Sequence, residues 1–116
     1  MPGGTNYENV VHLEPSDVQN GQVLGAQKPF VLVIYAPWCG HCKNLKSLWE
    51  ELAAQYPDSF LAVDATDKEN GGEQLAKILG AQGFPTILCG DASGKITGPH
   101  QGGRDRVSLM KSAKMQ

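Results

Sequence analysis

Trp-Cys-Gly-His-Cys-Lys, residues 38–43, directly follows a continuous apolar run, Phe30–Tyr35. Two cysteines separated by two residues, after a predicted buried strand and before a predicted helix, are typical of a redox-active dithiol. If the helix begins near Cys39, its unpaired backbone N–H groups and its dipole favour the thiolate of that residue. We therefore expect Cys39 to be the attacking thiolate and Cys42 the resolving thiol. The imidazolium of His41, between them, is expected to stabilise this thiolate and make the disulfide more oxidising.

A pair of cysteines at this spacing can also be half of a zinc site. A structural zinc site normally needs four Cys or His ligands, usually as a second closely spaced pair. Outside the motif the chain offers Cys89, His12 and His100, and none of these has a partner at short spacing. The spacing therefore favours redox chemistry over metal binding, and we expect no metal and no cofactor.

Hydrophobic spacing predicts alternating strands and helices. The expected strands cover residues 9–14, 29–36, 60–64, 86–89 and 95–97, and the expected helices cover residues 39–55, 73–79 and 105–114. A further short helix, capped by Ser16 or Asp17, is expected after the first strand.

Three segments resemble the catalytic (a-type) domains of protein disulfide isomerase, within the thioredoxin superfamily. Residues 35–43 are similar to the active-site segment of these domains, residues 83–87 to their cis-proline loop, and residues 63–66 to the end of their third strand. The segments occur in the order of the family, and the likeness extends over about residues 10–111. The resemblance implies an α/β protein with the thioredoxin fold, in which helices flank a central mixed sheet of four to five strands.

The resemblance also implies which residues form the site. The catalytic motif contains Cys39, Gly40, His41 and Cys42, and the residues expected to bind substrate are Trp38, Phe84, Pro85, Thr86 and Gly103. Trp38 is expected to stay partly exposed, as a wall for an extended partner chain. A cis peptide bond is implied before Pro85, beside backbone that pairs with substrate like an added strand. The implied partners are proteins with thiols or disulfides and a dithiol reductant or oxidant.

Certain positions depart from the family. Six residues before Cys39 the family carries a buried carboxylate that takes the proton of the second cysteine, and here that residue is Val33. The lysine that pairs with this acid is replaced by Ala62, and an arginine just before the cis-proline loop is replaced by Gln82. Replacing both members of a buried ion pair by apolar groups is often neutral for stability, so the fold is expected to survive. Cys42 is expected to have a raised pKa and to deprotonate reluctantly.

Length and composition limit the remaining possibilities. With 116 residues, of which 41% are hydrophobic, the chain suits one domain over residues 9–116 after a flexible tail over residues 1–8. The 10 Lys and Arg against 12 Asp and Glu do not suggest a nucleic acid or an anionic membrane as partner, and we expect a monomer. The third cysteine, Cys89, is most simply a small apolar residue of a strand. As written the chain has no signal peptide or retention signal, which indicates the cytoplasm, or the endoplasmic reticulum lumen if it is an excised domain.

The residues leave two classes of function open. The first is a thiol–disulfide oxidoreductase that acts on disulfides or dithiols of other proteins. The second is a thioredoxin-like binding or chaperone module whose groove around Trp38, Phe84 and Pro85 holds partners with little turnover. The replacements at Val33 and Ala62 keep the second class open, because they remove the family's route for deprotonating Cys42.

Overall fold

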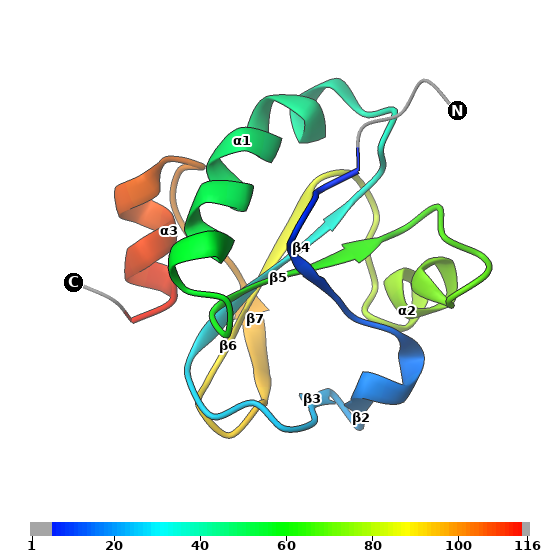
Figure 1. The fold of residues 1–116 in the computed structure, drawn as a ribbon. Helices are drawn as coiled ribbons and strands as arrows, with labels where there is room; N and C mark the ends of the chain where they lie inside the picture. Colours follow the sequence, from blue (N-terminus) through cyan, green and yellow to red (C-terminus); the bar gives the residue numbers. More distant parts are fainter. Residues whose placement is uncertain (1–5, 115–116) are drawn as a thin grey trace.

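The computed structural model describes residues 6–114, in which helices cover both faces of a mixed sheet (Figure 1). Its five strands, in spatial order, are β1 (Val11–His12), β5 (Phe60–Asp64), β4 (Phe30–Tyr35), β6 (Thr86–Gly90) and β7 (Ile96–Pro99). β4 lies in the middle, parallel to β5 and antiparallel to β6, and all six of its residues are buried. A central strand covered on both faces is what a continuous apolar run predicts.

The helices divide the core into two layers. The long helix α1 (Gly40–Gln55) and α3 (Arg106–Ser112) lie on one side of the sheet, and α2 (Gly72–Ile78) lies on the other (Figure 1). Alternate residues of β4 point to opposite faces, so Val31, Val33 and Tyr35 pack towards α1. The intervening β4 residues pack with Leu75 of α2. The active-site segment follows β4 and begins α1, so it is supported by the best-packed part of the sheet.

The first part of the chain differs from its prediction. The strand expected over residues 9–14 pairs with β5 only at Val11–His12, and the short helix expected after it is a single 3-10 turn, Pro15–Asp17. A hairpin of β2 (Val18–Gln19) and β3 (Gln22–Val23) follows. Its turn residues Asn20 and Gly21 both have positive φ, of 54° and 76°. Asn-Gly is the preferred pair for such a two-residue turn, so a hairpin rather than a helix forms here.

The packed chain begins earlier than residue 9. Tyr7, in the stretch expected to be a flexible tail, is only 2% exposed and belongs to the core beneath α1. Its ring stacks on Tyr35, with 4.1 Å between the ring centroids and 15° between the planes. Residues 1–5 of that stretch lie outside the described residues. The other helices and strands occur where they were expected, within two residues at each end.

Candidate active site

Cys39 lies at the junction between β4 and α1. It is the residue immediately before the helix, its N–H donates to the carbonyl of Ala36 at 3.0 Å, and its own carbonyl accepts the N–H of Lys43 at 3.0 Å. The first backbone N–H groups of a helix have no partner within the helix. The sulfur of Cys39 is therefore next to free donors and to the positive end of the helix dipole, as the sequence predicts.

The surroundings of Cys39 favour its thiolate. Burial acts in the opposite direction, but the pKa of Cys39 lies below its usual value because several groups stabilise the anion. The thiol and the backbone N–H of Cys42 donate to it, the backbone N–H of His41 adds a donor, and the charge of Arg104 attracts it. The side chain of His41 is exposed, so the contribution seen here comes from its backbone. Gly40 begins the helix, and an added Cβ there would meet no atom within 4 Å.

Cys42 has the opposite character. It is 1% exposed, and burial raises its pKa to about 12, with the neighbouring thiol of Cys39 adding to the increase. Val33 and Ala62 are adjacent in β4 and β5, fully buried, and part of the same apolar cluster as Cys42. From Val33 and Ala62 the sequence predicts a raised pKa for Cys42, and the apolar environment in the structure agrees with that prediction.

The cis-proline loop meets Cys39 directly. The peptide bond between Phe84 and Pro85 is cis, which confirms the expectation, and the Cys39 thiol donates to the carbonyl of Phe84 at 3.4 Å. Thr86 closes the loop by donating from its hydroxyl to the carbonyl of Gly83 at 2.6 Å. Trp38 is 65% exposed and stands edge-on to Phe84, with 6.0 Å between the ring centroids. An exposed aromatic wall therefore lies beside Cys39, the thiol whose pKa is lowered.

The loop before α3 supplies a charge that the sequence reasoning missed. Arg104 acts on both active-site thiols, whereas position 82, where the family resemblance led us to look for an arginine, is an exposed glutamine. His100 fixes this loop: its Nε2 donates to the carbonyl of Gly103 at 2.6 Å, and its Nδ1 is bonded to the hydroxyl of Ser112 in α3. A cavity of about 280 Å³ separates the loop from Pro85, and Arg104 lines it. Arg104 directly follows Gly102-Gly103 and Arg106 is two residues later, so the sequence gives no sign of which arginine faces the thiols.

A second missed feature lies on the opposite side of Cys42. The hydroxyl of Tyr7 donates to the carbonyl of Cys42 at 2.6 Å. The N–H of Tyr7 donates to the hydroxyl oxygen of Tyr35 at 3.2 Å, and Tyr35 is bonded in turn to Nε2 of His12 at 2.7 Å. These bonds join the start of the chain, β1, β4 and the first turn of α1. No local pattern in the sequence indicates them.

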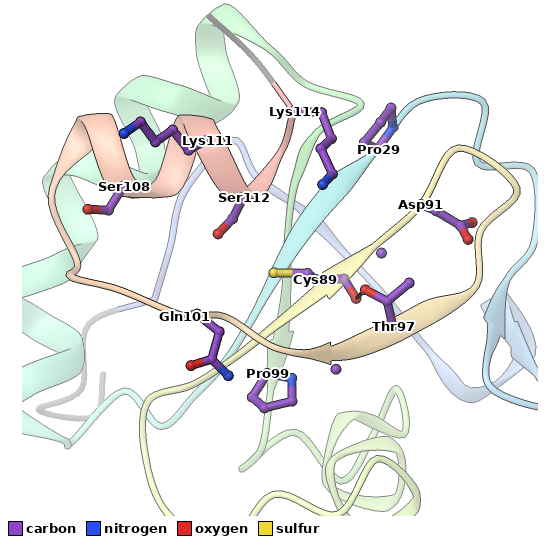
Figure 2. A pocket seen from close by; sticks show the side chains of 12 residues that line it. Pro29, Cys89, Asp91, Thr97, Pro99, Gln101, Ser108, Lys111, Ser112 and Lys114 are labelled. Atoms are coloured by element: carbon purple, nitrogen blue, oxygen red, sulfur yellow. Dashed lines mark hydrogen bonds between the residues drawn. The ribbon is translucent and has the colours of Figure 1, made fainter.

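Cys89 lies apart from the dithiol. It is half-buried in β6 and lines a groove of about 800 Å³ between the β6–β7 hairpin and α3 (Figure 2). Neither Cys39 nor Cys42 lines this groove. Within residues 6–114, no three His, Cys, Asp or Glu side chains come together as metal ligands would. In the same part of the chain, no helix combines the length and apolar character needed to cross a membrane.

Comparison with known proteins agrees with this geometry. Residues 9–115 match the family model for thioredoxin. The chain belongs to the thioredoxin family. This thioredoxin-family chain is 38% identical over 102 residues to protein disulfide-isomerase erp38 of Neurospora crassa, covering 86% of this chain and 27% of that protein. It is 33% identical over 111 residues to protein disulfide-isomerase A6 of Homo sapiens, covering 94% of this chain and 24% of that protein.

A solved structure agrees over nearly the whole fold. The short form of thioredoxin f from spinach chloroplast matches with a TM-score of 0.67 at 27% identity, covering 97% of this chain and 92% of that one. The chain spans about a quarter of the length of the disulfide isomerases, at 27% and 24%.

Proposed function

We propose that this thioredoxin domain is a thiol–disulfide oxidoreductase that exchanges disulfides with other proteins through Cys39 and Cys42. The observation that carries the proposal is the contrast between two neighbouring thiols. Cys39 is partly exposed with a lowered pKa, whereas Cys42 is buried with a pKa raised to about 12. Only a thiolate attacks a disulfide, so the contrast gives the two thiols different tasks.

The proposed cycle has two exchanges. The thiolate of Cys39 attacks a disulfide of the partner protein, whose S–S bond breaks, and a mixed disulfide forms while the other partner sulfur leaves as a thiolate. Cys42 then attacks the sulfur of Cys39, the mixed disulfide breaks, and the partner leaves reduced as the Cys39–Cys42 disulfide forms. The reverse sequence oxidises a partner dithiol. A separate dithiol reductant or oxidant restores the starting state.

The proposed substrate surface surrounds Cys39. Trp38 and Phe84 form an apolar wall on one side, and the loop with Gly103 and Arg104 lies beside Pro85. Exposed apolar surface next to a reactive sulfur suits an extended or partly unfolded chain, whose own apolar side chains can cover it. We propose that such chains are the substrates and that the domain acts on them as a monomer.

The test is catalysis of insulin reduction by a small dithiol, followed by refolding of reduced ribonuclease. The natural domain is expected to accelerate both reactions, and the double variant Cys39→Ser, Cys42→Ser is expected to accelerate neither. Cys89→Ser is the matched control, because Cys89 lies outside the site and its loss should leave the rates unchanged. Equal rates for the natural domain and the double variant would reject the proposal.

A second function, a binding module with little turnover, is favoured by one observation. Val33 and Ala62 leave Cys42 in an apolar environment that opposes its ionisation, so turnover through the dithiol would be slow. This module would bind an unfolded chain equally well with and without its cysteines. Binding of reduced, alkylated ribonuclease that survives the double variant, without catalysis by the natural domain, would select it.

A further inference from the structure

In the proposed cycle Cys42 must become a thiolate, which requires a group that stabilises the negative sulfur. Val33 and Ala62 are fully buried neighbours of this thiol in the core, and they offer it neither a charge nor a hydrogen bond. A thiolate formed in such surroundings is unfavourable unless a donor is near. The backbone N–H of Ala36 favours the thiolate, but the pKa of Cys42 stays high, so the question is which side chain of the core can add a second donor.

Tyr7 is the polar side chain that already contacts Cys42 from within the core. Its hydroxyl donates to the carbonyl oxygen of Cys42 at 2.6 Å, and the residue is 2% exposed. The carbonyl and the sulfur belong to the same residue, and Tyr7 and Cys42 share one buried cluster, so the proposal requires this hydroxyl to turn from the carbonyl to the sulfur when the thiolate forms. For the Tyr7 hydroxyl a thiolate sulfur is a stronger acceptor than the carbonyl oxygen, because hydrogen bonds to charged acceptors are stronger than those to neutral ones.

The rest of Tyr7 is held in place. Its ring stacks on Tyr35, and its N–H donates to the Tyr35 hydroxyl oxygen at 3.2 Å. Nδ1 of His12 lies 2.8 Å from the carbonyl of Val10, which can only accept, so Nδ1 carries a proton. In the neutral ring Nε2 then accepts the Tyr35 O–H at 2.7 Å, and the Tyr35 oxygen stays free to accept from Tyr7. The donor is thus positioned before Cys42 ionises, which lowers the entropy lost in forming the new bond.

We propose that the hydroxyl of Tyr7 is the hydrogen-bond donor that stabilises the thiolate of Cys42 while it resolves the mixed disulfide. The inference rests on the proposed function for this step. Cys42 gives its proton to the thiolate that the partner releases, a sulfur–sulfur bond to Cys39 forms, and the bond from Cys39 to the partner breaks. Tyr7 keeps its own proton throughout.

The protonation state of Tyr7 supports the role of donor rather than base. Burial, followed by the neighbouring thiol of Cys42, holds the pKa of Tyr7 well above its usual value. The hydroxyl therefore stays protonated at any pH where the exchange runs. In this protein a neutral donor from the N-terminal segment supports the second cysteine, whose cluster neighbours Val33 and Ala62 are apolar.

Tyr7→Phe tests the proposal because it keeps the stacked ring and removes only the hydroxyl. Quenched-flow trapping with a disulfide-containing peptide separates attack by Cys39 from resolution by Cys42. Resolution near pH 7 is expected to slow about tenfold, the size of one hydrogen bond to a charged group, while attack changes less than about twofold. Tyr56→Phe is the matched control, since Tyr56 packs on Phe60 at the other end of α1. A resolution rate equal to that of the natural domain would overturn the proposal.

A second measurement does not depend on turnover. In the Cys39→Ser background, the alkylation rate of Cys42 is followed by mass mapping near pH 9, where it reports the fraction present as thiolate. Adding Tyr7→Phe is expected to slow this alkylation about tenfold, and adding Tyr56→Phe is expected to leave it unchanged. Equal rates with and without the Tyr7 hydroxyl would overturn the inference even if the domain is an active oxidoreductase. A slowed rate would support it even if the natural domain fails to reduce insulin.

Discussion

Val33 of β4 lies opposite Ala62 of β5, and neither side chain has any exposed surface. Both belong to the apolar cluster that contains Cys42, under the first turns of α1. In such surroundings a thiol resists ionisation, which accounts for the high pKa of Cys42. The apolar surroundings that this pair of side chains gives Cys42 therefore make the two active-site thiols differ in pKa: that of Cys39 is lowered and that of Cys42 is raised.

Alkylation of the reduced protein near pH 7 is expected to modify Cys39 well before Cys42 or Cys89. Cys39 combines partial exposure with a lowered pKa, whereas Cys42 is buried and its pKa is raised to about 12. Mass mapping after short exposure to iodoacetamide measures the order of labelling. Labelling of Cys42 or Cys89 first would contradict the assignment of Cys39 as the nucleophile.

The variant His41→Pro is expected to raise the pKa of Cys39 and make the disulfide less oxidising. Two losses act in the same direction, because proline removes both the imidazole and the backbone N–H that donates to Cys39. Equilibration with glutathione measures the reduction potential, in which about 30 mV corresponds to a tenfold change in equilibrium.

The variant His41→Ala separates the two contributions at this position. This variant keeps the backbone N–H and removes only the exposed imidazole. If the charge of the imidazole is responsible, the reduction potential of His41→Ala should resemble that of His41→Pro. A potential like that of the natural protein would assign the effect to the backbone N–H. An unchanged or more oxidising potential in both variants would mean that neither group stabilises the thiolate.

The variant Arg104→Gln is expected to slow alkylation of Cys39 near pH 7. The charge of Arg104 lowers the pKa of both thiols, so its loss leaves a smaller fraction of Cys39 as thiolate. Because Arg104 is exposed, we expect a decrease of about threefold at low ionic strength that shrinks with added salt. Arg106→Gln is the control, since that guanidinium pairs with Glu51 at 2.7 Å. Equal effects of the two variants would indicate net charge rather than position.

The fold and the dithiol could be predicted from the sequence because their signals are local. The six consecutive apolar residues Phe30–Tyr35, rich in β-branched and aromatic side chains, favour a buried strand, and the cysteine spacing is contained in one helical turn. The Asn20-Gly21 pair is also a local signal, for a hairpin, but the helix expected here rested on the possible caps Ser16 and Asp17.

The remaining features arise only in three dimensions. Tyr7 and Cys42 are 35 residues apart in sequence, and only the packing of the first residues under α1 brings them together. The charge of Arg104 lowers the pKa of both thiols because its loop lies beside the cis-proline loop, and no neighbouring residue in the sequence indicates that proximity. Contacts between elements distant in sequence have no periodic or spacing signature. The sequence therefore predicts the reactive pair of cysteines, but it does not indicate Tyr7 and Arg104 as their neighbours.

The stability of the reduced protein is expected to fall as pH rises from about 9 towards 12, because of Cys42. Its pKa rises from an ordinary 9.0 to about 12 on folding, so the unfolded chain ionises first. The contribution is fully present below pH 9.0 and is lost as pH rises through about 12. Urea unfolding in excess reductant gives the free energy of unfolding at each pH. The difference in this free energy between the natural protein and Cys42→Ala isolates the contribution of Cys42, because other groups titrate in both proteins. A constant difference across this range would contradict the burial of Cys42 as a thiol.

Restoring the missing acid should lower the stability of the fold and accelerate resolution of the mixed disulfide by Cys42. Val33→Glu buries a carboxylate without a partner and is expected to destabilise the fold by about 3–5 kcal/mol. The same carboxylate can take the proton of Cys42, so trapped mixed disulfides should clear faster near neutral pH than in the natural protein. Adding Ala62→Lys, directly opposite in the sheet, should recover part of the stability because it pairs the charge. Quenched-flow trapping from about pH 6 to pH 9 makes the comparison, with urea unfolding for stability. Equal resolution rates throughout would show that Cys42 loses its proton to the partner thiolate or to water fast enough without a carboxylate.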